Sequence, residues 1–259
     1  MKATRLTLIM MHKSSSRCFF LLILVLLIHT SHAHAQNFLS RPPAPNVLGP
    51  GPTGAIYVVP LPSVGVSLAG CDCSDGVVAK PAVSYSLGIA GAFYLLGGKS
   101  FVTWLAPVAE VSYDSHGALL TGPNGFGSKL RADYLMFSSG LQIYHAFTLV
   151  LNVGIPLSLT TTTPVSGNSD LVTTPSTSML NTLTEARLVL AAPIGQRGSA
   201  GPALIGFISL AYPLNTMFRD RFDLIDGSGK LRGSVASLRL PSIQFGLTLA
   251  FVPYIRYPN

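Results

Sequence analysis

The sequence predicts an all-β fold, a single antiparallel up-and-down transmembrane β-barrel of about eight strands. Three observations lead to this prediction. Of the 259 residues, 48% are hydrophobic and only 10% are charged, whereas soluble domains usually carry about 25% charged residues. Large apolar side chains recur at every second position, which is the period of a β-strand. The connections between these segments alternate between short and long, as they do in membrane barrels.

Residues 1–35 have the three parts of a secretory signal peptide. A basic segment without acids precedes the apolar run from Phe19 to Ile28, and small residues follow, ending in Ala33-His34-Ala35. This A-x-A pattern predicts cleavage before Gln36. The alternative is an uncleaved anchor, but the apolar run is shorter than the ~20 residues that a membrane-spanning helix needs. The basic residues of the segment are Lys2, Arg5, Lys13 and Arg17.

Cleavage would lower the net charge of the chain. The mature part keeps 13 basic and ten acidic residues, so the formal charge falls from +7 to +3. The high isoelectric point therefore belongs mainly to the signal, and we expect no nucleic-acid partner. Residues 36–52 contain five prolines and are expected to form an irregular periplasmic lead-in. Residues 53–259 are expected to form the barrel.

Eight segments of the mature chain read as strands. The clearest is Phe147–Thr160, in which apolar residues from Phe147 to Leu159 alternate with residues such as Asn152, Gly154 and Ser158. Phe101–Tyr113 has a broken alternation, which predicts a bulge. The other expected strands are Ala55–Leu68, Val83–Phe93, Asp133–Ile143, Leu183–Ile194, Ala203–Leu214 and Ser242–Phe251.

The direction of the alternation favours a membrane. A soluble sheet turns its apolar face to a core and a charged face to water. In these segments the second face is small and neutral, which suits a narrow barrel with apolar residues toward lipid. A soluble sandwich or a lipocalin-like barrel is the alternative, because its strands alternate too.

The expected connections fall into two classes. Three are short, at 97–100, 144–146 and 196–201, and four are long, at 70–80, 114–131, 161–178 and 215–235. Turn signals at Gly122–Gly125 and Asp226–Gly229 indicate hairpins within two of the long ones, and the Thr/Ser-rich 161–178 is expected to be a flexible outer loop. The two mature cysteines, Cys71 and Cys73, are spaced too closely for an ordinary unstrained bridge and lack further zinc ligands, so the sequence assigns them no role.

The final strand carries the most specific resemblance. A polar residue, a glycine and two apolar residues one apart stand at Gln244, Gly246, Leu249 and Phe251. This arrangement resembles the signal that outer-membrane barrels present to their assembly machinery. Together with the strand rhythm, it makes the chain similar to small outer-membrane barrels of the OmpA/OmpX and PorT-like type. The resemblance implies an outer-membrane location, with membrane lipid and the barrel-assembly machinery as partners. It implies no single activity, since this fold serves many functions.

Few residues suggest chemistry. Glu185 and Arg187 share one face of their strand and should point inward with Glu110, either as an interior ion-pair network or as an ion path. Ser115 and His116, with the preceding Asp114, include the residue types of a hydrolase triad, but neighbouring residues of a strand point to opposite faces. We therefore expect no enzyme, cofactor or metal site. The expected function is structural or interaction, with outer loops on display toward an unidentified envelope partner. The alternatives are a narrow channel, a rim-located lipid hydrolase and a soluble ligand-binding barrel.

Overall fold

In the computed structural model, eight antiparallel strands form a closed ring. The structure describes residues 53–96, 105–143, 147–165, 169–194, 203–226 and 228–250. The expected signal and lead-in, including Ala33, Ala35 and Gln36, lie outside these ranges, and so does Phe251. The ring strands are β1 (Thr53–Ser67), β3 (Val78–Leu96), β4 (Leu105–Thr121), β5 (Gly127–Ile143), β6 (Phe147–Val165), β8 (Leu183–Pro193), β9 (Ala203–Pro213) and β12 (Ser242–Ala250).

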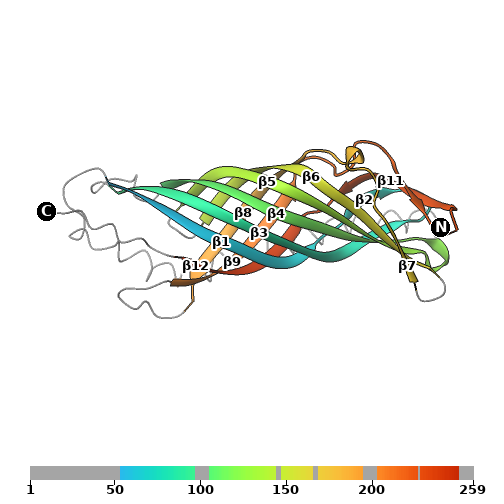
Figure 1. Ribbon diagram of the computed structural model, residues 1–259, viewed down its shortest axis with the longest axis horizontal. Coiled ribbons are helices and arrows are strands. Elements are labelled where there is room, and N and C mark those ends of the chain that lie inside the picture. The colour runs from blue at the N-terminus through green and yellow to red at the C-terminus, as the bar shows by residue number, and fades with distance from the viewer. Residues whose placement is uncertain are drawn as a thin grey trace, which may run out of the picture. The chain divides into compact units, whose positions relative to one another are not determined.

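Each ring strand pairs with its neighbour along the chain, and β12 closes the ring by pairing with β1 (Figure 1). The closing ladder joins Ser63–Ser67 of β1 to Ser242–Gly246 of β12, so at this level every ring strand has a partner on both sides. The predicted fold class, an up-and-down barrel of eight strands, is confirmed by this pairing. In the described part of the chain, no helix is both long and apolar enough to cross a membrane.

The alternation of side chains follows the expected faces over most of the wall. On β4, every even-numbered residue from Ala106 to Leu120 is buried. The register of β4 with β5 is unbroken from Leu105 to Thr121, so the bulge expected within Phe101–Tyr113 is absent from the described part of that segment. Bulges occur instead between Pro81 and Tyr85 of β3 and opposite Asp133 and Tyr134 of β5.

The second bulge corrects one predicted face. Leu159 was expected to share the outward face of β6 with Leu149 and Leu151. Asp133 pairs with Ser158 and Tyr134 with Pro156, so one extra residue of β6 stands between them. An extra residue reverses which side of the strand each following side chain takes. Leu159 therefore turns inward and is buried.

Strands extend into two of the connections that were expected to be long. β4 continues to Thr121 and β5 begins at Gly127, with only a tight turn around the 3-10 segment Pro123–Gly125 between them. Likewise β6 runs to Val165 and pairs with β7 (Ser169–Thr173), before a second 3-10 segment at Thr177–Met179. The hairpin expected within 114–131, with its turn at Gly122–Gly125, is confirmed. The expectation of a flexible loop at 161–178 is wrong for 161–165 and 169–173, which are paired strands. The threonines of β6 favour extended backbone and keep this hairpin in the sheet.

A second, three-stranded sheet continues the wall at one end of the barrel. We call it the lid; it contains β2 (Gly70–Cys73), β10 (Phe222–Ile225) and β11 (Leu231–Arg239). β2 follows β1 and β11 precedes β12, so the two chain segments that pair in the wall pair again in the lid. Between the two ladders, the Leu68 amide donates to the Pro241 carbonyl at 2.6 Å. Figure 1 shows β2 and β11 together beyond the ends of β1 and β12.

The largest hydrophobic core joins the lid to the inner face of β4, β5 and β6. Phe222, Leu224, Val235 and Leu238 from the lid share one buried cluster with inward residues of the wall. The rings of Phe218 and Phe222 stack at 4.8 Å between centroids. Because apolar burial is the main stabilising contribution to folding, the lid is a packed part of the fold. The buried wall residues of this cluster are Ala118, Leu120, Leu130, Ala132, Tyr134, Met136 and Leu159, with Leu183 of β8.

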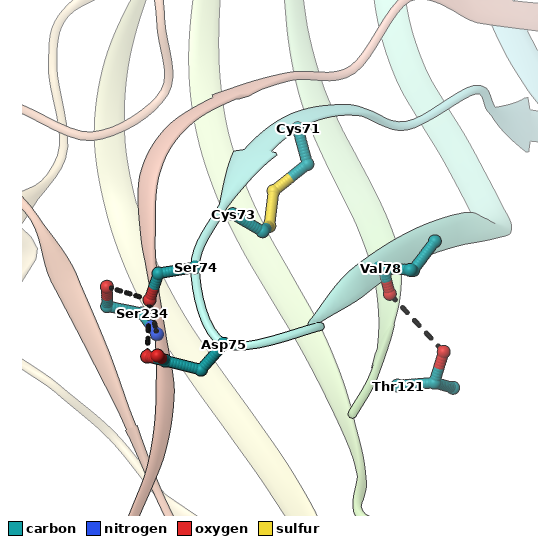
Figure 2. The surroundings of a disulfide bond; sticks show 7 residues. All are labelled: Cys71, Cys73, Ser74, Asp75, Val78, Thr121 and Ser234. Carbon is teal, nitrogen blue, oxygen red and sulfur yellow. Dashed lines mark hydrogen bonds between the residues drawn. A yellow bond between two sulfur atoms is a disulfide. The ribbon is translucent and has the colours of Figure 1, made fainter. Parts of the chain in front are cut away.

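Cys71 and Cys73 form a disulfide in β2 of the lid. Their Cα atoms are 5.5 Å apart, which is within the range that a disulfide accepts. Figure 2 shows the bond beside the turn that leads into β3, where Ser74 and Ser234 join their hydroxyls at 2.9 Å. The sequence assigned these two cysteines no role, and the structure joins them to each other across Asp72.

Candidate functional site

A buried arginine occupies the middle of the barrel. Arg187 lies on β8 and its side chain is surrounded by Glu110 and Asp114 of β4 and by Glu185 of its own strand. We call these four residues the arginine cluster. In the ring, β5 and β6 stand between β4 and β8, so the arginine reaches across the lumen rather than along the wall.

The guanidinium contacts all three carboxylates. Its Nη1 donates to Glu110 Oε1 at 3.1 Å, and its Nη2 donates to Glu185 Oε1 at 2.7 Å and to Asp114 Oδ2. Every member of the cluster is at least nine-tenths buried. Ion pairs removed from water are stable only when further hydrogen bonds satisfy their remaining atoms.

Neighbouring strands supply those hydrogen bonds. The Asn152 amide donates to Glu185 Oε1 at 2.6 Å, and the Ser86 hydroxyl donates to Asp114 Oδ1 at 2.5 Å. The register explains the first contact, because Asn152 pairs directly with Glu185 across β6 and β8. The carboxylates nevertheless outnumber the guanidinium, and Glu185 Oε2 has no partner within the described part of the chain.

The structure thus brings together the three interior charges expected from the sequence, and it adds Asp114. Sequence reasoning missed Asp114 because this residue was assigned to the loop at 114–131. A signal for it was present, since Glu110, Ser112 and Asp114 keep one parity along β4 and are all buried. Continuing the predicted strand Phe101–Tyr113 by one residue would have placed the Asp114 carboxylate in the lumen with that of Glu110.

The three residues Asp114, Ser115 and His116 do not converge. Asp114 and His116 point inward, and the His116 ring lies edge-on to Tyr134, 6.0 Å between centroids. Ser115 pairs with Asp133 of β5 and faces the other side of the wall. Neither nitrogen of the His116 ring has a hydrogen-bond partner within the described residues. The geometry of a serine–histidine pair is therefore not present here.

No metal site accompanies these residues. Within the described ranges, no group of three or more His, Cys, Asp and Glu side chains could hold a metal ion. The Arg187 guanidinium occupies the space between the three carboxylates of the cluster and forms ion pairs with all of them.

The final strand places its signal residues on opposite faces. Gln244 points inward, accepting from the Ser63 hydroxyl at 2.8 Å and donating to Ser84 Oγ at 3.4 Å. Gly246 pairs with Phe207, whose ring covers the position where a Cβ would stand. Leu249 is exposed on the outer face. The motif therefore combines an inward polar contact, a glycine that leaves room for the Phe207 side chain, and an outward apolar residue.

Among the described side chains, the outer wall carries exposed large apolar residues on seven of the eight ring strands, β8 being the exception. On β6, Leu149, Leu151, Val153 and Ile155 are 58%, 58%, 47% and 50% exposed. Equivalent outward residues elsewhere on the ring are Val64 and Val66, Leu87 and Ile89, Val111, Phe137 and Leu141, Leu204, and Phe245, Leu247 and Leu249. The charged cluster is buried while many large apolar side chains are exposed, the reverse of the usual pattern in a soluble protein.

Comparisons with known proteins assign no family. No family model matches the chain, and no curated protein matches it. Among solved structures, the crystal structure of Neisserial surface protein A is similar with a TM-score of 0.34 and 11% sequence identity, over 77% of this chain and 99% of that chain. The barrel class of this protein rests on its own strand pairing.

Proposed function

We propose that this protein is an outer-membrane β-barrel with a structural or interaction role, which presents the lid outside the membrane. The observation that carries the proposal is the distribution of side chains: large apolar residues are exposed on seven of the eight ring strands, while the charged arginine cluster is buried within. Exposed apolar surface on this scale is stable against hydrocarbon and unstable in water. We include in this proposal that the protein is similar to small outer-membrane barrels of the OmpA/OmpX and PorT-like type.

Two features of the interior favour a scaffold over a channel. The arginine cluster spans the lumen, and beyond it the lid packs onto the inner face of β4, β5 and β6 through a continuous apolar core. An eight-stranded barrel has an interior just wide enough for its side chains. Water and ions would have to pass both the ion pairs and the apolar core.

The proposed partners follow from the surfaces. Membrane lipid contacts the apolar wall, the barrel-assembly machinery reads the final strand, and an envelope partner of unknown identity contacts the lid. The proposal includes export through the signal at residues 1–35, no catalytic activity and no cofactor. Accordingly, Ser115→Ala and His116→Ala should leave any lipid-modifying activity of the purified protein unchanged. A loss in either folded variant would promote the hydrolase alternative.

Cell fractionation tests the location. The mature protein is expected with outer membranes, and unheated samples should migrate differently from heated samples in detergent gels, because the closed barrel resists unfolding. Release in soluble form by osmotic shock would contradict the proposal and favour the soluble ligand-binding barrel.

Planar-bilayer recording then tests the scaffold role. The reconstituted protein should show no steady conductance above that of empty bilayers. The matched comparison combines Arg187→Ala with Glu110→Gln, Asp114→Asn and Glu185→Gln, because it opens the lumen at the cluster without leaving unpaired buried carboxylates. Steady wild-type conductance that changes on these substitutions would establish the channel alternative.

A further inference from the structure

The outward face of β3–β6 carries a compact group of charged side chains at one height. Among the described residues of these four strands, the outward charges are Lys80, Lys129, Arg131 and Asp133. Their orientation follows from their neighbours: Ala79 and Leu130 pack into the hydrophobic core, so Lys80 and Lys129, one residue along, point away from it. We call Lys80, Lys129 and Arg131 the outer basic patch.

The strand register sets the spacing of the patch. Lys80 pairs with Leu119, which pairs with Lys129. Neighbouring strands are about 4.8 Å apart, so the two lysines start about 10 Å apart. Arg131 is the next outward residue after Lys129 on β5, about 7 Å along the strand. Three cations therefore surround a space of the size of one lipid headgroup.

Arg131 is held in position by its neighbours. Its Nε donates to Asp133 Oδ1 at 2.9 Å, and its Nη2 donates to Tyr113 Oη at 3.1 Å and to the Tyr85 hydroxyl. Its Cζ lies 5.0 Å from the centroid of the Tyr85 ring. Nevertheless 47% of the Arg131 side chain is exposed, against 10% for Asp133. The guanidinium is thus oriented but still open to an external acceptor, and a positioned arginine is the best protein donor for phosphate.

Asp133 does not neutralise the patch. The Ser158 hydroxyl also donates to it, at 2.5 Å, so its two oxygens are engaged within the wall. Three cations and one carboxylate leave a net charge of +2 on this outward surface. The complementary ligand is an anion.

The height of the patch relative to the apolar wall identifies where that anion comes from. A strand tilted by about 45° rises about 2.4 Å per residue, so an apolar band of about 25 Å takes about ten residues. The outward apolar residues of β5 begin at Ile143 and end at Leu135, and Asp133 and Arg131 come next. Tyr85 and Tyr113 stand at the same level, as aromatic residues do at a membrane interface. The patch therefore begins where hydrocarbon gives way to headgroups.

We propose that the outer basic patch binds the phosphate of an anionic membrane lipid. Arg131 donates to the phosphate oxygens, Lys80 and Lys129 neutralise its charge, and the lipid chains lie along the apolar wall below. The inference rests on the proposed membrane location, and it adds a defined lipid site on one side of the barrel, β3 to β6.

Native mass spectrometry of the full chain tests the site. Protein is released from nanodiscs of equal phosphatidylglycerol and phosphatidylcholine with the same acyl chains, and the retained lipids are counted. The test variant is Lys80→Gln/Lys129→Gln, which leaves the Arg131 contacts within the wall. The control is Arg219→Gln/Lys230→Gln, which removes the same charge from exposed positions outside the ring strands. Heat-dependent gel mobility verifies that each variant is folded.

Wild type and control should retain phosphatidylglycerol preferentially. One cation near a membrane surface contributes about a five-fold preference for anionic lipid, so the lysine pair should lower the preference about 25-fold. Equal retention of both lipids by wild type, or an equal loss in control and test variants, would refute the site. Binding of inorganic phosphate as tight as that of phosphatidylglycerol would assign the patch to free phosphate instead.

A separate arm distinguishes this inference from the proposed function. Insertion into phosphatidylcholine vesicles, followed by protease protection, does not need the patch. Failure to insert would overturn the membrane proposal itself. Insertion without a preference for phosphatidylglycerol would overturn only the lipid site.

Discussion

Replacing Arg187 by Met should strongly destabilise the barrel while leaving its outer surface unchanged. Methionine keeps much of the length of the side chain but removes the guanidinium and its three carboxylate contacts, two of them at 2.7 and 3.1 Å. Glu110, Asp114 and Glu185 would then be buried together without a cation. Removing one partner of a buried ion pair costs about 3–5 kcal/mol, and three like charges place this substitution at the upper end of that range.

The loss should depend on pH and on the companion carboxylates. Protonation removes the repulsion, so the Arg187→Met variant should recover stability as the pH falls toward the ordinary carboxyl range near 4. The matched control combines Arg187→Met with Glu110→Gln, Asp114→Asn and Glu185→Gln. This neutral interior should recover most of the lost stability, because replacing a whole buried ion-pair network is often close to neutral.

Urea unfolding of the detergent-folded protein measures both effects. The folded fraction is read from unheated gels and the free energy of unfolding from linear extrapolation. A loss below about 1 kcal/mol for Arg187→Met would show that the cluster behaves as a solvated surface pair. A loss that is the same at acid and neutral pH would refute the like-charge argument.

Four further outcomes are expected. The exported protein should begin at Gln36, and an intact mass that retains the basic n-region would contradict cleavage after Ala35. Leu190→Arg should impair insertion, because a charge that faces hydrocarbon near mid-depth costs roughly 2–4 kcal/mol. The measurement is the fraction of protein whose gel mobility changes on heating, compared with Leu190→Met. Gly246→Ala should lower the free energy of unfolding in urea by about 1–3 kcal/mol, because its Cβ would stand 2.2 Å from the Phe207 ring and 2.4 Å from the Pro62 carbonyl oxygen. A variant as stable as wild type would disprove the close packing of Phe207 on Gly246. Hydrogen bonds from Ser228, from the Lys230 amide and from Arg232 lower the pKa of Asp226, so the β10–β11 hairpin should be stabilised above the ordinary aspartate range and lose that contribution on acidification. The measurement is the protection factor of the Lys230 amide against hydrogen exchange. The same pH dependence of this factor in wild type and Asp226→Asn would refute the argument.

Local pattern was sufficient for the wall of the barrel. Alternation along segments such as 242–250 depends only on the two-residue period of a strand, which each side chain shows independently of distant partners. The same parity placed Glu185 and Arg187 on one face. The turn residues Gly122–Gly125 and Asp226–Gly229 likewise act within four residues of chain, and both turns are present in the structure.

The errors arose where the chain responds to distant segments. Residues 114–121 and 161–165 lie beyond the ends of the strands that the sequence predicts, but they are strand because each pairs with a neighbour already in the sheet. Leu159 points inward because β6 has a bulge opposite Asp133. The bulge arises from the register between β5 and β6, so neither strand's sequence predicts it alone.

By itself the sequence determined which segments are strands and which of their faces is apolar, because that information is local and repeats every second residue. Only the tertiary structure decided what the faces meet. Ring closure brings Arg187 within reach of Asp114, and the second pairing of the β1 and β12 segments folds the lid onto the tall strands β4, β5 and β6. The outer basic patch has the same origin, since Lys80 and Arg131 are brought together by register across three strands. Such contacts join residues far apart in the chain, and their partners are selected by the whole ring of hydrogen bonds.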